Sequence, residues 1–105
     1  MRNTIHSGRY DEFVALGTSG KSEAVDLLMT ALVAQDDLAT SKLVDFALGL
    51  VNTREGTNRL RHYLYNGCLI QRNYAALYFK RKGHTSLLED ALAKGKIDWE
   101  QAFSK

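Results

Sequence analysis

The chain of 105 residues contains no proline. Average usage of about 5% would place about five prolines in a chain of this length. Because proline removes a helical hydrogen bond and clashes with the preceding turn, its absence leaves every segment free to continue as helix. No segment shows a sustained alternation of apolar and polar residues, which would indicate a strand. The sequence therefore predicts an all-α protein.

Apolar spacing and capping residues predict about six helices. The predicted ranges are 10–16, 23–35, 38–51, 57–66, 69–82 and 87–94, with a further turn or two over 98–103.

Particular residues mark the expected helix ends. Asp36 or Asp37 can cap the helix that begins near residue 38. Asn66-Gly67 is expected to end the fourth helix in the left-handed conformation, as Gly83 and Gly95 are for the next two. Ser86 and Glu89 have the spacing of a capping box.

Size and composition indicate one ordinary globular domain over residues 1–105, with residues 1–18 as a more loosely packed segment. Apolar residues make up 45% and charged residues 25% of the chain. No run approaches the roughly 18 apolar residues that a membrane span needs. The amino terminus lacks the apolar region of a secretory signal, and the one cysteine fits a reducing compartment. We expect a cytoplasmic protein.

The predicted helices follow one another as pairs joined by short turns, with an irregular period of roughly 28 to 35 residues. Residues 71–83, QRNYAALYFKRKG, resemble the second helix of a HEAT-type repeat, notably the short bacterial variety. The resemblance covers residues 69–94 and depends on an arginine, a spacer, small residues and a leucine before a glycine. It implies a short right-handed α-solenoid that serves in scaffolding or binding.

Charge is distributed unevenly along the chain. The net charge is +2, but the first 57 residues carry five basic and eight acidic side chains. Residues 58–84 contain no acidic side chain and six basic ones: Arg59, Arg61, Arg72, Lys80, Arg81 and Lys82. This acid-free stretch is the first place to look for a binding surface.

A helical projection of residues 69–82 predicts two apolar faces, one around Tyr74 and Tyr78 and one around Ala75 and Phe79. The arc left open between these faces forms most of the predicted partner-binding surface. An arginine of the preceding helix, Arg59 or Arg61, would join it if the packing of the helices brings one alongside. The candidate residues are Arg72, Asn73, Ala76, Lys80, Arg59 and Arg61. The alternative is a solvated face, with the terminal cations compensating the helix dipole.

These features predict a non-enzymatic helical-repeat module that binds a protein partner through a basic surface. Nucleic-acid binding is an alternative, although the aromatic side chains are expected on the buried arc and would not offer a base-stacking platform.

A third hypothesis comes from residues 15–22, ALGTSGKS, which resemble a Walker A loop with alanine in place of the first glycine. The resemblance implies that Lys21 reaches nucleotide phosphates and that Ser22 ligates Mg²⁺. Such a loop normally follows a buried strand, and ordinary loop chemistry before a capped helix explains the same residues.

Other chemistries have weaker support. Cys68 lies at a helix start, where the dipole can lower a thiol pKa, but the candidate base His62 lies two turns earlier across a helix break. His6, His62 and His84 lack the spacing of a metal site. We therefore expect no catalytic residue, cofactor or metal, and the oligomeric state stays open.

Overall fold

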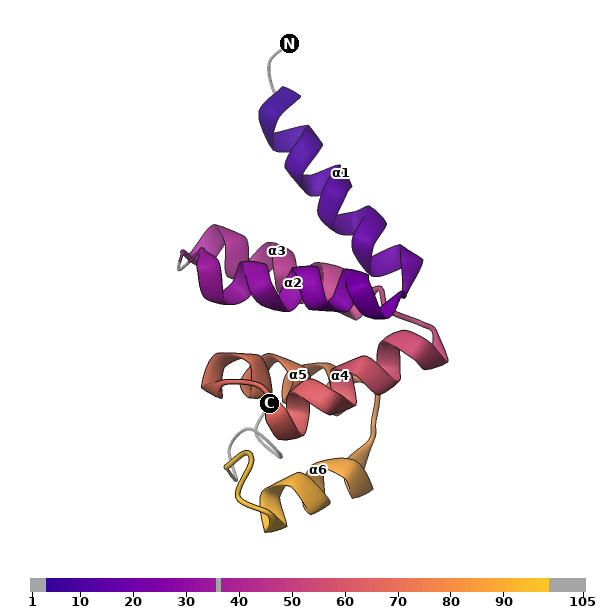
Figure 1. Ribbon diagram of the computed structural model, residues 1–105, viewed down its shortest axis with the longest axis vertical. Helices are drawn as coiled ribbons and strands as arrows, with labels where there is room; N and C mark the ends of the chain where they lie inside the picture. The colour runs from indigo at the N-terminus through magenta and orange to yellow at the C-terminus, as the bar shows by residue number, and fades with distance from the viewer. Residues whose placement is uncertain (1–3, 36, 99–105) are drawn as a thin grey trace. The chain divides into compact units, whose positions relative to one another are not determined.

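The computed structural model of the protein describes residues 4–35 and 37–98. These residues form six α-helices and no strand, which confirms the all-α prediction (Figure 1). The helices are α1 (Thr4–Ser19), α2 (Ser22–Ala34), α3 (Leu38–Gly49), α4 (Arg54–Asn66), α5 (Leu69–Arg81) and α6 (Thr85–Ala93). The turn predicted over residues 98–103 lies almost wholly outside the described residues. No helix in the described part of the chain is long and apolar enough to cross a membrane.

Two helices, α1 and α4, begin at least three residues earlier than their local sequence indicated. Helix α1 covers 16 residues, where only 10–16 were predicted. Helix α4 begins at Arg54 instead of residue 57, because the Thr53 hydroxyl accepts a hydrogen bond from the Gly56 amide at 2.9 Å and so satisfies its first turn.

Two of the predicted glycine stops are confirmed. Gly83 and Gly95 have φ angles of 79° and 73°, in the left-handed region. Helix α4 ends at Asn66 as predicted, but the left-handed conformation predicted for Asn66-Gly67 is wrong, because neither residue has a positive φ. Gly67 is instead required by close approach, since a Cβ there would lie 2.8 Å from the Tyr63 carbonyl oxygen.

The capping assignments are also partly corrected. Asp37 caps α3, and its Oδ1 accepts a hydrogen bond from the Thr40 amide at 2.7 Å. The capping box predicted from Ser86 and Glu89 is wrong, because α6 begins at Thr85 and places Ser86 inside the helix. The N-terminus of α5 has such a contact instead, from the Cys68 amide to the Gln71 side chain at 3.0 Å.

The chain divides into two compact units, unit 1 (Met1–Arg59) and unit 2 (Leu60–Lys105), with the boundary inside α4. A single domain over residues 1–105 stays a prediction.

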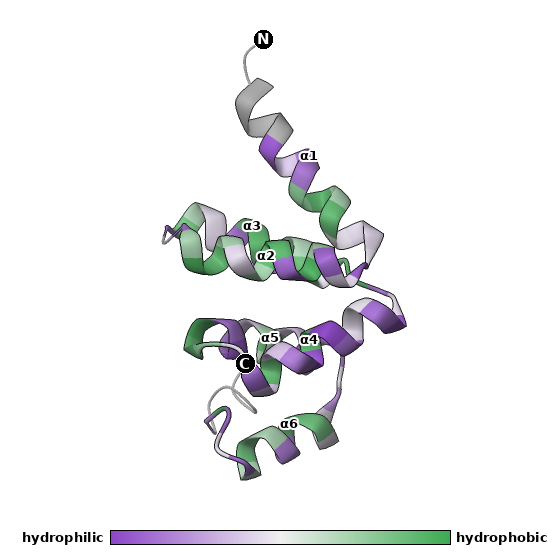
Figure 2. Cartoon of the chain, viewed as in Figure 1, coloured by the Kyte–Doolittle hydropathy of each residue, from purple (hydrophilic) through white to green (hydrophobic). Residues whose placement is uncertain are grey.

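In unit 1, α2 and α3 form an antiparallel pair and α1 crosses them obliquely (Figure 1). Both paired helices are strongly apolar, whereas α4 is mainly hydrophilic (Figure 2). The interior that α2 and α3 share is fully buried and consists of Val25, Leu28, Met29, Leu32, Val44, Ala47 and Leu48. Burial of this apolar surface is the main source of stability in a unit of this kind.

In unit 2, α5 packs against α6. The projection correctly placed Ala75, Tyr78 and Phe79 among buried residues. It was wrong for Ala76, which is fully buried although it was assigned to the open arc. A side chain of one carbon allows close packing on that side of the helix, which a projection of one helix cannot reveal.

Candidate partner-binding surface

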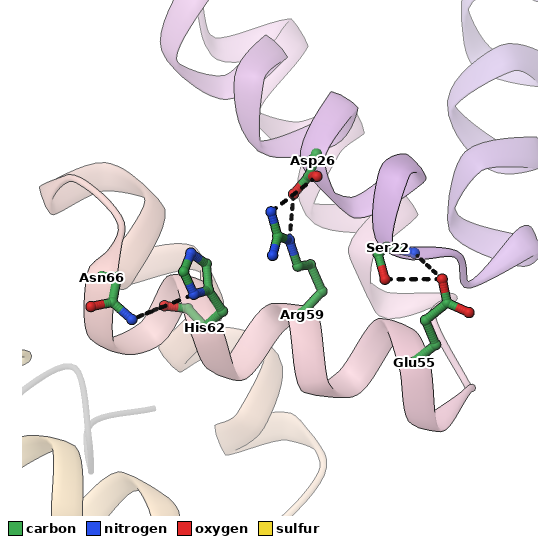
Figure 3. A network of polar contacts seen from close by, with 6 residues as sticks. All are labelled: Ser22, Asp26, Glu55, Arg59, His62 and Asn66. Atoms are coloured by element: carbon green, nitrogen blue, oxygen red, sulfur yellow. Dashed lines mark hydrogen bonds and ion pairs between the residues drawn. The ribbon is translucent and has the colours of Figure 1, made fainter.

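The six cations of the acid-free stretch have different environments. Arg59 makes a two-pronged ion pair with Asp26, which joins α4 to α2 within unit 1 (Figure 3). The Nε–Oδ1 distance is 2.7 Å and the Nη2–Oδ2 distance is 3.2 Å. This fork geometry is the strongest form of an arginine–carboxylate contact. Arg59 therefore contributes to folding.

A second polar contact joins the same two helices. The Glu55 carboxylate accepts hydrogen bonds from the Ser22 amide at 2.8 Å and from the Ser22 hydroxyl at 2.9 Å (Figure 3). These bonds, the backbone one first, lower the pKa of Glu55 below its ordinary value. The carboxylate thereby occupies the N-terminus of α2, where the helix dipole favours an anion.

That carboxylate bears directly on the resemblance of residues 15–22 to a phosphate loop. Residues 15–19 form the last turn of α1, so a helix and not a strand precedes the motif. Only Gly20 and Lys21 lie between α1 and α2. Because Glu55 already holds the Ser22 amide and hydroxyl, the arrangement argues against the nucleotide-binding alternative.

Arg72 is also engaged internally. Its Nε donates to the Lys96 carbonyl at 2.8 Å, and its Nη1 donates to the Gly67 carbonyl at 2.9 Å. The side chain is half-buried and connects the start of α5 to the segment after α6. Its hydrogen bonds satisfy the backbone carbonyl groups of Gly67 and Lys96, which lie outside α5 and α6. Arg72 therefore acts as a brace within unit 2.

The remaining predicted residues separate by exposure. Asn73 and Lys80 are half-buried and make interactions within the chain. Arg61 is exposed on α4. The next two cations after Lys80, Arg81 and Lys82, are exposed as well, and the Lys82 ammonium lies 5.4 Å from the centre of the Tyr78 ring. We call the exposed side chains Arg61, Arg81 and Lys82 the outer cations; Arg81 also makes an interaction within the chain.

An acidic group of unit 2 is neutralised locally. Asp90 accepts a hydrogen bond from the Tyr65 hydroxyl and pairs with the Lys94 ammonium at 3.2 Å. Both contacts lower the pKa of Asp90, and desolvation together with Asp90 raises the pKa of Tyr65 to about 12. The Asp90 carboxylate therefore interacts with Tyr65 and Lys94, both within unit 2.

Among the described residues, no group of three histidine, cysteine or acidic side chains could hold a metal ion. Cys68 is exposed, and the His62 ring contacts the Asn66 side chain on the same helix (Figure 3).

Sequence reasoning missed both contacts between α2 and α4. A signal was available, since Ser22 and Asp26 are four residues apart, as are Glu55 and Arg59. Such spacing places each pair on one helix face, ready for a complementary pair on another helix.

No protein-family model, no curated protein and no solved structure matches the chain. The described residues therefore define the class of the protein, which is an all-α protein with six helices in this part of the chain.

Proposed function

We propose that the protein is a non-enzymatic helical module that binds an acidic segment of a protein partner through the outer cations. One observation carries the proposal: the acid-free stretch leaves Arg61 and Lys82 exposed, while Arg59 and Arg72 make contacts inside the fold. Exposed cations without neighbouring carboxylates in the sequence attract acidic ligands and speed their association.

The charge of unit 2 as a whole supports the same partner chemistry. Residues 60–105 carry eight basic and four acidic side chains. The Arg72 guanidinium donates its Nε and Nη1 hydrogen bonds to two carbonyl groups and not to a carboxylate, so they do not neutralise its positive charge. An approaching acidic segment would therefore experience a net attraction beyond its direct contacts.

A protein partner is favoured over nucleic acid for two reasons. Stable binding to a phosphate backbone uses many cations, about 6–10 in well-studied cases, and two of the six here are engaged internally. In addition, Tyr78 and Phe79 are buried and cannot stack on bases.

The proposal includes the helical-repeat organisation implied by residues 69–94. This segment corresponds to α5 and α6, two helices that pack against each other as a repeat pair would. We also propose that the protein is cytoplasmic and that it functions without a cofactor.

Fluorescence anisotropy with a labelled glutamate-rich peptide tests the proposal. Arg61→Ala and Lys82→Ala should each weaken binding by about 2- to 5-fold, the effect of losing roughly 0.5–1 kcal/mol from an exposed charge pair. Lys21→Ala is the matched control, because Lys21 is exposed but lies outside the acid-free stretch. It should leave the affinity unchanged.

The same titration with single-stranded and duplex oligonucleotides of equal charge distinguishes the alternative. Tighter binding of an oligonucleotide, with a steep loss of affinity as salt rises, would replace the protein-partner proposal by nucleic-acid binding. Peptide affinity that is equal in all three variants and the native protein would refute the role of the outer cations.

A further inference from the structure

Unit 1 has an aromatic pair at its surface. The rings of Tyr10 on α1 and Phe46 on α3 stack with their centres 5.9 Å apart and their planes 22° apart. They are 48% and 47% exposed, so each ring keeps about half of its surface in water. The two helices that carry them pack against each other through the unit 1 interior.

This pair is well suited to form an interface. Aromatic side chains bury roughly 150–250 Å² each when covered, more than most other residues. Because the two rings already hold each other in place, covering them would cost less conformational entropy than ordering two separate side chains. Val14 and Leu43 extend the apolar character, since both are half-buried and project near the rings on their helices.

The exposed charges beside the rings have opposite signs on the two helices. Arg9 on α1 donates to Gln35 and Thr40, and Asp45 on α3 is half-buried and makes an interaction within the chain. Asp11 lies about 100° around α1 from Tyr10, on the side away from buried Phe13. Lys42 lies about 40° around α3 from Phe46, on the side away from buried Ala47. Both are exposed, and neither has an ion-pair partner among the described residues. The surface therefore runs from an acid on α1, across two rings, to a base on α3.

We infer that two copies of the chain associate through this surface about a two-fold axis. A two-fold interface uses the same patch on both copies, so the patch must complement itself. Rotation about an axis through the aromatic pair brings Asp11 of one copy opposite Lys42 of the other, and the same contact occurs twice. A uniformly acidic partner would be repelled by Asp11 and a uniformly basic one by Lys42, whereas a second copy satisfies both.

An interface built on two half-exposed rings from each copy would be small, so we expect a weak dimer. Interfaces below about 1,200 Å² belong to transient complexes, so we expect a dissociation constant on the order of 10–1000 μM. This surface shares no residue with the outer cations, so dimerisation and acidic-partner binding can fail separately.

Sedimentation velocity over a range of protein concentrations tests the inference. The native protein should sediment faster as its concentration rises, and Phe46→Ser should stay monomeric. Leu27→Ser is the matched control, because Leu27 is 57% exposed on α2 and lies outside the proposed surface. It should dimerise as the native protein does.

Charge exchange gives a test that does not depend on removing an aromatic ring. Asp11→Lys alone should weaken dimerisation by about 5-fold or more, because it sets two lysines against each other at both contacts. Combining Asp11→Lys with Lys42→Asp should restore it, since the exchanged charges again face opposite signs. A native protein that stays monomeric at millimolar concentration, or an exchanged double variant no better than Asp11→Lys, would overturn the inference.

Discussion

Arg72 illustrates how a residue selected as a binding candidate can belong to the fold. Its guanidinium donates to the carbonyls of Gly67 and Lys96. We expect Arg72→Ala to lower the free energy of unfolding by about 1–3 kcal/mol, because part-buried carbonyls lose their donors. Arg72→Lys should restore little, since one ammonium group lacks the planar fork that reaches both carbonyls. Urea denaturation measures both effects, and unchanged stability of Arg72→Ala would contradict this role.

Glu55 gives a prediction about pH. Its pKa is lowered from the ordinary value of 4.5 by hydrogen bonds from Ser22, so the folded state binds the proton less tightly than the unfolded state does. The resulting stabilisation is complete above the ordinary pKa and is lost as pH falls through the lowered one. Asp37 and Asp90 also have lowered pKa values and lose stabilisation in the same direction.

The contribution of Glu55 can be isolated by comparing the native protein with Glu55→Gln. Thermal melts from about pH 6 to about pH 3 should show a smaller loss of stability in the variant, because one of the linked carboxyl groups is missing. Parallel pH profiles for the two proteins would show that the Ser22 contact does not form in solution.

At the scale of helices, Gly17 determines how closely α1 approaches α3. A Cβ at this position would lie 2.1 Å from the carbonyl oxygen of Ala47, so the backbones themselves would have to separate. Gly17→Ala should therefore destabilise the protein by about 1–3 kcal/mol, although alanine is the better helix former.

Gly49 on α3 provides the matched control, since a Cβ there would have nothing within 4 Å. Gly49→Ala should leave stability unchanged or raise it by about 0.4–1 kcal/mol. Chemical denaturation of both variants tests the comparison. Equal effects of the two substitutions would contradict the close crossing of α1 and α3.

The helices themselves were largely predictable, because their signals are local. Missing proline, apolar spacing and the left-handed glycines Gly83 and Gly95 indicated where helices run and end. Gly67 was misread because a glycine can serve close approach as well as a positive φ. Ser86 was misread because a capping-box spacing can also occur within the first turn of a helix.

At the scale of the whole molecule, the candidate site was predictable only in outline. The absence of acids over residues 58–84 is visible in the sequence. The internal use of two arginines is not, because their partners are distant: Asp26 precedes Arg59 by 33 residues, and Lys96 follows Arg72 by 24. Such partners are set by tertiary packing, which a projection of a single helix cannot contain.

The two units also differ in charge. Residues 1–59 carry six basic and eight acidic side chains, whereas residues 60–105 carry eight and four. The outer cations belong to the basic unit, and the aromatic pair proposed for dimerisation belongs to the acidic one. Binding of an acidic partner and self-association are therefore expected to respond to different substitutions.

The most direct test of the central claim is the affinity of the double variant Arg61→Ala/Lys82→Ala for a labelled glutamate-rich peptide, measured beside its unfolding free energy. We expect about a 5- to 25-fold loss of affinity at unchanged stability, since each exposed charge contributes roughly 0.5–1 kcal/mol. Affinity equal to that of the native protein would contradict the claim that the outer cations form the binding surface.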